Sequence, residues 1–133
     1  MRLATTAIFV VEDEPLIQEI LQAVLEDSGF EVNVACSSME AIATLEAQPS
    51  KFRALITDVN LACSELTGWD VAKRARELKP DLPVVYMTGD SAHEWTSVGV
   101  PNSVLLMKPF TFSQLVTAVS QLLNGSVPDA FKP

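Results

Sequence analysis

The sequence of 133 residues predicts an α/β fold in which helices cover both faces of a five-stranded parallel sheet. Five short apolar stretches alternate with longer segments whose apolar residues recur at helical spacing. Most of the short stretches lack polar alternation, which is typical of parallel strands buried on both faces. Strands and helices that alternate in this way indicate a doubly wound sheet within one domain of ordinary length.

The first strand is predicted over Ala7–Val11, an unbroken apolar run. The helix that follows begins at Pro15, because the missing N–H of proline costs nothing in a first helical turn. Gly29 is placed to end that helix. The second strand is predicted over Phe30–Ala35, where apolar residues alternate with polar ones.

The second helix begins at a capping-box signature, Ser37 followed three residues later by Glu40, and ends before Pro49. The third strand is the short apolar run from Ala54 to Thr57, which leads directly into Asp58. The third helix is predicted over 69–78. Its neighbouring cations are interpreted as a solvated surface that balances local acid: Lys73, Arg74, Arg76 and Lys79.

The fourth strand, Pro83–Met87, ends at Thr88, and a short, weakly patterned helix is predicted over Ala92–Val98. The fifth strand, Val104–Met107, ends at Lys108. A second capping box, Thr111 with Gln114, begins the last helix, which is expected to stop at Gly125.

Apolar residues at helical spacing are expected to face the core in the first, second and last helices, and two phenylalanines near the last helix are expected to pack there. These residues are Leu16, Ile17, Ile20, Leu21, Val24 and Leu25; Met39, Ile42, Ala43 and Leu45; Leu115, Val116, Val119, Leu122 and Leu123; and Phe110 and Phe112.

Composition and charge exclude several classes of function. Seventeen acidic and nine basic side chains give a formal charge of −8, which argues against binding nucleic acid or an anionic membrane through a basic face. Two cysteines without paired spacing and one histidine nearly exclude a structural zinc site. No signal peptide is visible and no apolar stretch approaches the ~20 residues that span a bilayer, so a cytoplasmic location is expected.

Charged or polar side chains follow four of the five predicted strands. Glu12 and Asp13 follow the first strand, Asp58 the third, Thr88 the fourth and Lys108 the fifth. Because ligands of open parallel sheets bind outside the carboxyl ends of the strands, we expect these side chains to form one cluster.

The chemistry of this cluster suits phosphoryl transfer. Carboxylate oxygens are the ligands that a hard divalent cation such as Mg²⁺ prefers. A bound cation would leave Asp58 ionised and able to act as a nucleophile. Lys108 supplies a point positive charge and Thr88 a hydroxyl donor for phosphoryl oxygens, and phosphoryl transfer needs mainly positioning and charge stabilisation.

These motifs together resemble the receiver domain of two-component response regulators. The resemblance rests on the acidic pair Glu12-Asp13, on Asp58, on Thr88 and on Lys108-Pro109-Phe110, and it covers about residues 6–124. It implies a flavodoxin-like (βα)5 fold with strand order 2-1-3-4-5. The expected organisation is a receiver domain over 1–125 and a short tail over 126–133, without an output domain.

The resemblance implies a magnesium site and a phosphorylation site. Asp13 and Asp58 would bind Mg²⁺ directly, Glu12 through water, and Asn60 through its backbone carbonyl. Asp58 would accept a phosphoryl group from a sensor histidine kinase or a histidine phosphotransfer protein.

Two further residues would hold the phosphoryl oxygens, namely Lys108 and Thr88. The protein would then signal to an unidentified downstream protein by changed protein–protein contact. It would not be an enzyme beyond intrinsic autophosphorylation and autodephosphorylation.

The sequence departs from the family pattern at two places near the site. Thr88 and Leu105 occupy the two switch positions, but Leu105 replaces the aromatic residue that many receivers have there. The loop from Asn60 to Gly68 looks longer than usual, with Ala62 in place of a common proline. This loop could alter access to the site or be a neutral surface insertion.

Three alternatives remain open. The chain could be a pseudo-receiver that docks without phosphorylation, which Leu105 mildly favours. It could be a receiver cut from a hybrid kinase or a larger regulator. A phosphatase that uses Asp58 as a covalent nucleophile ranks last, because Asn60 stands where a second acid would be needed.

Overall fold

The computed structural model describes residues 6–62 and 65–123, so the expected helix stop at Gly125 and the tail over 126–133 lie outside the described residues. Five parallel strands form one sheet in the order β2-β1-β3-β4-β5, as predicted. The strands are β1 (Ala7–Val11), β2 (Glu31–Ala35), β3 (Ala54–Asp58), β4 (Val84–Thr88) and β5 (Ser103–Met107).

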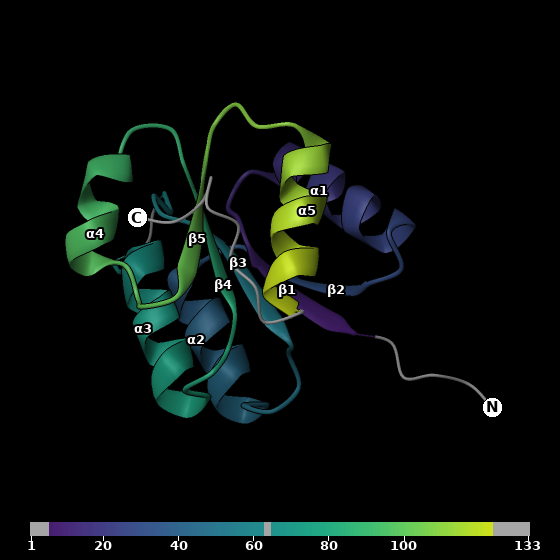
Figure 1. The fold of residues 1–133 in the computed structure, drawn as a ribbon. Coiled ribbons are helices and arrows are strands. Elements are labelled where there is room, and N and C mark those ends of the chain that lie inside the picture. The colour runs from purple at the N-terminus through teal and green to yellow at the C-terminus, as the bar shows by residue number, and fades with distance from the viewer. Residues whose placement is uncertain (1–5, 63–64, 124–133) are drawn as a thin grey trace.

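Helices cover both faces of the sheet. α1 (Pro15–Asp27) and α5 (Phe112–Leu123) lie on one face, and α2 (Ser38–Ala47) and α3 (Gly68–Leu78) lie on the other (Figure 1). The helix α4 (Trp95–Val98) is only one turn long and follows the 3₁₀ turn η1 (Ala92–Glu94). None of the helices within the described ranges is long and apolar enough to cross a membrane.

Side chains of each central strand alternate between two hydrophobic clusters, one on each face of the sheet. In β1, Phe9 packs in the cluster beneath α2 and α3, whereas Ile8 and Val10 pack in the cluster beneath α1 and α5. Every residue of β1, β3 and β4 is buried. Burial on both faces explains why these strands are continuous apolar runs in the sequence.

Side-chain caps fix the starts of three helices. Gln114 and Thr111 form the predicted capping box of α5: the Thr111 N–H donates to Gln114 Oε1 (2.7 Å) and the Gln114 N–H donates to Thr111 Oγ1 (3.1 Å). At α2 the Ser37 hydroxyl accepts from the Glu40 N–H (3.1 Å), and Glu40 Oε1 accepts from the N–H of Cys36 (2.8 Å). The third cap, at α3, borders the functional site and is described there.

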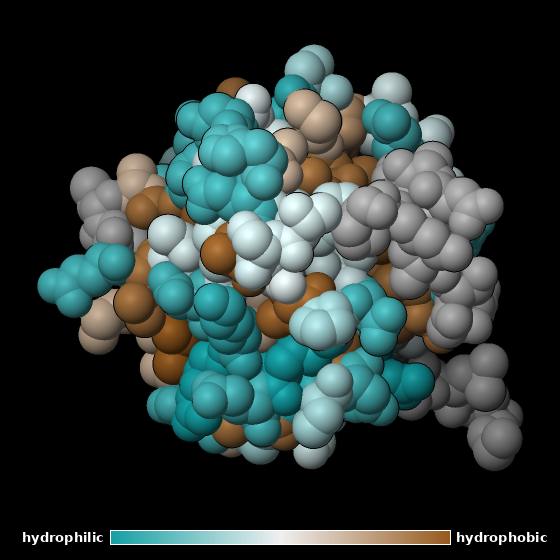
Figure 2. Space-filling model, turned by 60° about the vertical axis from the view of Figure 1, so that its left-hand side comes forward, coloured by the Kyte–Doolittle hydropathy of each residue, from teal (hydrophilic) through white to brown (hydrophobic). Residues whose placement is uncertain are grey.

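Five apolar side chains that were expected in the core are exposed instead: that of Ala43 and four larger ones. Their exposed fractions are 68% for Leu16, 38% for Ile20, 67% for Met39 and 53% for Phe112. The apolar stripe of α1 is wider than its contact with the sheet, so that only Leu21 and Leu25 are fully buried from that helix. Figure 2, which brings the side of α3 and α4 forward, shows hydrophobic residues in small areas between hydrophilic ones.

The interpretation of the α3 cations as a solvated surface is wrong for Arg76. Its guanidinium donates to three backbone carbonyls, those of Leu82 (2.6 Å), Pro101 (2.6 Å) and Asn102 (3.4 Å). Burial lowers the pKa of Arg76, although nearby acidic groups oppose that shift. Arg76 therefore joins the end of α3 to the turn before β5, which sequence spacing alone does not reveal.

Candidate phosphorylation site

Three carboxylates meet at the carboxyl edge of the sheet. β1 leads directly into Glu12 and Asp13, and Asp58 is the last residue of the neighbouring strand β3. One oxygen atom from each of the three carboxylates lies within 4.8 Å of the others. Glu12 and Asp58 are buried, with exposed fractions of 0% and 6%, and Asp13 is half-buried. The structure therefore brings together the acidic residues that the sequence places at separate strand ends.

Lys108 adds the only ammonium group that the described residues place in this cluster. Its Nζ donates to Asp58 Oδ2 at 2.8 Å and lies 3.7 Å from Glu12 Oε1. Its backbone N–H donates to the carbonyl of Thr88 (2.8 Å), which extends the pairing of β4 with β5 as far as the site. The peptide bond from Lys108 to Pro109 is cis.

The acidic cluster carries more negative than positive charge, which favours the protonated form of Glu12. Burial raises the pKa of Glu12 to about 7, and the charge of Asp58 raises it too, whereas the Glu14 N–H that donates to Glu12 Oε2 (3.1 Å) lowers it. Burial lowers the pKa of Lys108, but its hydrogen bond with Asp58 and the nearby carboxylate charges raise it, and the net shift is upward. One ammonium therefore faces three carboxylates.

The donor set fits a divalent cation. Glu12 Oε1 is buried and accepts no hydrogen bond, although the Lys108 ammonium lies nearby. All the side-chain donors are carboxylate oxygens, which suit Mg²⁺, and Mg²⁺ commonly uses only one or two carboxylates with several waters. The residues of this edge thus match the requirement of a magnesium ion.

The start of α3 packs directly against the backbone of Asp58. A Cβ atom on Gly68 would lie 2.0 Å from the carbonyl oxygen of Asp58, so only glycine fits at this position. The Gly68 N–H also donates to the carbonyl of Val59 (2.8 Å). Thr67 caps the same helix in a capping box with Asp70, a Thr-x-x-Asp pattern that the sequence prediction overlooked.

The loop after β3 is tied to both neighbouring strand ends. Asp13 Oδ2 accepts from the N–H of Ala62 (2.7 Å), and Nδ2 of Asn60 donates to Oδ1 of Asp90 (2.8 Å). The N–H of Asn60 also donates to Asp58 Oδ1 (3.3 Å). These contacts hold the described part of this loop against the acidic cluster. Sequence spacing gave no signal for the Asp90 contact, since it depends on the path of two loops.

Thr88 is fully buried at the end of β4. Its Oγ1 accepts from the N–H of Ser91 (2.8 Å) and from that of Asp90 (3.3 Å), which orients the side chain at the carboxyl edge. A hydroxyl that accepts in this way can still donate its own hydrogen. Leu105 is partly buried and lies beside Tyr86 in the register of β4 and β5, so the aromatic ring in this region belongs to β4.

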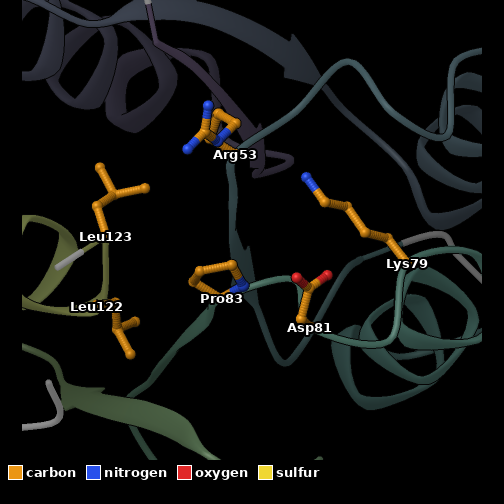
Figure 3. A pocket seen from close by; sticks show the side chains of 6 residues that line it. All are labelled: Arg53, Lys79, Asp81, Pro83, Leu122 and Leu123. Carbon is orange, nitrogen blue, oxygen red and sulfur yellow. The ribbon is translucent and has the colours of Figure 1, made fainter. Parts of the chain in front are cut away.

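A pocket of about 200 Å³ lies at the opposite edge of the sheet, where β3 and β4 begin. Arg53, Lys79 and Asp81 line it together with Pro83 and two residues of α5, Leu122 and Leu123 (Figure 3). The Lys79 ammonium donates to the carbonyl of Phe52 (3.0 Å). This pocket lies at the amino ends of the strands and is therefore separate from the acidic cluster at their carboxyl ends.

The fold and this arrangement of acids, hydroxyl and lysine define a receiver domain. The family model for the response regulator receiver domain matches residues 8–120. The chain therefore belongs to the response regulator receiver family, and its length is that of a single such domain.

Solved and curated relatives are similar over most of the chain. A response regulator receiver protein from Sinorhizobium medicae is 41% identical with a TM-score of 0.87, covering 92% of this chain and 98% of that one. An uncharacterised 14.6 kDa protein of Leptolyngbya boryana is 33% identical over 96% of this chain and 98% of its own length. Response regulator SaeR of Staphylococcus aureus is 29% identical over 90% of this chain, which spans about half of SaeR (51%).

Proposed function

We propose that this receiver domain accepts a phosphoryl group on Asp58 in a Mg²⁺-dependent two-component phosphorelay. The main support is the ion pair between Lys108 Nζ and Asp58 Oδ2 (2.8 Å) inside a group of three close carboxylates. This arrangement provides a nucleophilic carboxylate, a cation for a phosphoryl oxygen and an oxygen-rich metal site in one place.

The donor is a phosphohistidine of a sensor histidine kinase or of a histidine phosphotransfer protein. A carboxylate oxygen of Asp58 attacks the phosphorus atom, the P–N bond breaks, and its electron pair returns to the imidazole nitrogen. Lys108 and Thr88 would hold oxygen atoms of the transferred group, because both side chains lie at the edge where Asp58 ends β3.

The metal ligands would be Asp13, Asp58 and the backbone carbonyl of Asn60, with Glu12 bound through water. When bound, Mg²⁺ supplies positive charge that neutralises the carboxylates and the phosphoryl oxygens. The buried, unbonded Glu12 Oε1 supports this assignment, since a buried acceptor without a hydrogen bond is costly unless another group satisfies it.

A phosphoryl group at this edge would act on other proteins by changing the surface near Thr88. The downstream partner is a protein, and the partner-binding domain lies within residues 1–125. Leu105 favours one competing role, that of a docking module which never becomes phosphorylated, because the aromatic residue common at this switch position is replaced.

Acetyl phosphate with Mg²⁺ tests the proposal directly. We expect intact-mass measurement to detect one added phosphoryl group on the wild type and on the control Asp81→Asn, whose carboxylate lies at the opposite edge of the sheet. Asp58→Asn should remain unmodified. The proposal fails if the wild type stays unmodified with donor, Mg²⁺ and a cognate kinase. Equal partner affinity for the wild type and Asp58→Asn would favour the docking role.

A further inference from the structure

The hydroxyl of Tyr86 holds the turn between α4 and β5 from inside the protein. Tyr86 lies in the middle of β4 and is fully buried. Its hydroxyl oxygen accepts a hydrogen bond from the backbone N–H of Val100 at 3.0 Å. Because a buried polar atom without a partner is costly, this bond strongly favours one position of the turn relative to β4.

A second pair of hydrogen bonds holds the other side of the same turn. The indole Nε1 of Trp95 in α4 donates to Ser103 Oγ (2.9 Å), and Ser103 Oγ donates to the carbonyl of Val100 (2.7 Å). Both backbone polar groups of Val100 are therefore bonded to side chains, one from β4 and one from β5. The one-turn helix α4 is positioned through these contacts and through the packing of Trp95.

Tyr86 also contacts α3, the helix whose first residue packs against the backbone of Asp58. Its ring centroid lies 4.5 Å from that of Trp69, with the ring planes tilted by 58°. Trp69 follows Gly68, and Gly68 packs directly against the backbone carbonyl of Asp58. The ring thus lies between the first turn of α3, which contacts the backbone of Asp58, and the turn that positions α4.

The strand β4 also connects Tyr86 to Thr88, the residue that ends this strand beside the acidic cluster. The two residues are two positions apart in β4, so their side chains lie on the same face of the sheet. Across the sheet, Tyr86 pairs with Leu105 of β5, whose aliphatic side chain offers no hydrogen bond to the turn. Through its hydroxyl, Tyr86 of β4 instead accepts a hydrogen bond from the N–H of Val100 in that turn.

We propose that Tyr86 is a positioning residue that couples the charge state of Asp58 to the geometry of α4 and the turn at Val100. This inference rests on the proposed function, since it assumes that a phosphoryl group forms on Asp58. A change at Thr88 or at the start of α3 shifts the Tyr86 ring, and the hydroxyl transfers that shift to Val100. The indole of Trp95 then responds through Ser103.

The test compares the wild type with Tyr86→Phe, which removes only the hydroxyl. Both proteins are saturated with beryllofluoride and Mg²⁺, and ¹⁵N–¹H spectra record the Val100 amide and the Trp95 indole before and after. We expect large activation-dependent shifts at both groups in the wild type. In Tyr86→Phe these shifts should fall by about half or more, because the direct bond that couples the two elements is gone.

Ser97→Ala is the matched control, because it removes a hydroxyl of α4 whose hydrogen bond is local, to the Glu94 carbonyl in the adjoining 3₁₀ turn (3.1 Å). This variant should respond like the wild type. A second variant, Ser103→Ala, should lose the Trp95 response and keep that of Val100, and it tests the route even if Tyr86→Phe folds poorly.

The possible outcomes separate the coupling from the proposed function. Full Val100 and Trp95 responses in a folded Tyr86→Phe protein would overturn the role of Tyr86. A Val100 response that disappears equally in Ser97→Ala would overturn it too, because the effect would then belong to α4 in general. Acetyl phosphate that leaves the wild type unmodified would instead contradict the proposed function. Mass measurement of each variant with acetyl phosphate keeps these results distinct, since Tyr86→Phe should still gain one phosphoryl group.

Discussion

The ammonium group of Lys108, which follows β5, binds the carboxylate of Asp58 at the end of β3 at 2.8 Å, past the end of the intervening strand β4. The same nitrogen lies 3.7 Å from Glu12 Oε1, so one cation is shared by two buried acids. The candidate phosphoacceptor is therefore already paired with the group that we expect to bind its phosphoryl oxygen.

Removal of this cation should destabilise the metal-free protein. Lys108→Met leaves Glu12 and Asp58 facing each other without a counter-charge. The lysine side chain is 30% exposed, so solvent screening reduces the effect, and we expect a loss of about 1–2 kcal/mol in the free energy of unfolding. Urea unfolding in the presence of a chelator measures this loss.

Lys73→Met, which removes an exposed cation of α3, is the control and should change the free energy of unfolding by less than ~0.5 kcal/mol. Equal losses in the two variants would contradict the shared role of Lys108.

Magnesium should stabilise the folded protein through the acidic cluster. A ligand that binds only the folded state at a hundred times its Kd adds about 2.7 kcal/mol to the free energy of unfolding. We expect a rise of this order in urea titrations with increasing Mg²⁺. Asp13→Asn should greatly weaken the rise, because it removes one carboxylate of the three. Asp81→Asn, at the other edge of the sheet, should keep it. If Mg²⁺ has no effect on the wild type, the cluster is not a magnesium site.

The close approach of α3 to Asp58 should make Gly68 intolerant of substitution. A Cβ at this position would lie 2.0 Å from the Asp58 carbonyl oxygen, and backbone atoms cannot move aside as a flexible side chain can. Gly68→Ala should therefore lower the free energy of unfolding by about 2 kcal/mol or more, within the range of overpacking. Gly89→Ala is the control, since nothing lies within 4 Å of its added Cβ. Thermal and urea unfolding of both variants distinguish a local steric clash from a general cost of replacing glycine.

Tyr86 should make the stability depend on pH in the alkaline range. Burial raises the pKa of Tyr86 to about 12, above the ordinary value of 10.0, while the hydrogen bond from Val100 opposes the shift. The folded state therefore holds the phenolic proton more tightly than the unfolded state. This contribution, about 2–3 kcal/mol for a shift of about two pKa units, is fully present below pH ~10 and is lost as pH rises through ~12.

Urea unfolding of wild type and Tyr86→Phe across that range isolates the effect, because other titrating groups are common to both proteins. The difference between the two free energies of unfolding should shrink as pH rises. Parallel pH profiles would show that the buried hydroxyl does not titrate in this way.

Most of the fold could be predicted because the chain alternates between two distinct periodicities. The predicted and observed strands differ where a residue could belong either to the strand or to the turn beside it. Phe30 was predicted to begin the second strand, but β2 begins at Glu31, and the Phe30 N–H donates to the carbonyl of Leu25 (3.1 Å) in the turn that follows α1. β4 begins at Val84 rather than Pro83 and extends to Thr88, which pairs with Met107. Helical spacing also cannot tell how much of an apolar stripe touches the sheet, which is why Met39 was placed wrongly in the core.

The candidate site was predictable to the extent that it follows from strand ends. Parallel strands bring their carboxyl ends to one edge, so Glu12, Asp58 and Lys108 could be placed together from the order of the elements. The contact between Asp13 and the N–H of Ala62 could not be predicted, because it depends on the path of a loop. The role of Tyr86 was missed for a similar reason: its partner Val100 lies fourteen residues away in a turn.

The close, tilted contact between the rings of Tyr86 and Trp69 makes the intrinsic fluorescence of the protein sensitive to unfolding. Tyr86 is the only tyrosine of the chain, and its ring centroid lies 4.5 Å from that of Trp69. At so short a separation, an excited tyrosine passes its energy to the indole before it can emit. The native protein should therefore emit as a purely tryptophan-containing one, and tyrosine emission near its own wavelength should appear only when α3 separates from β4. No label is needed to follow that separation in real time.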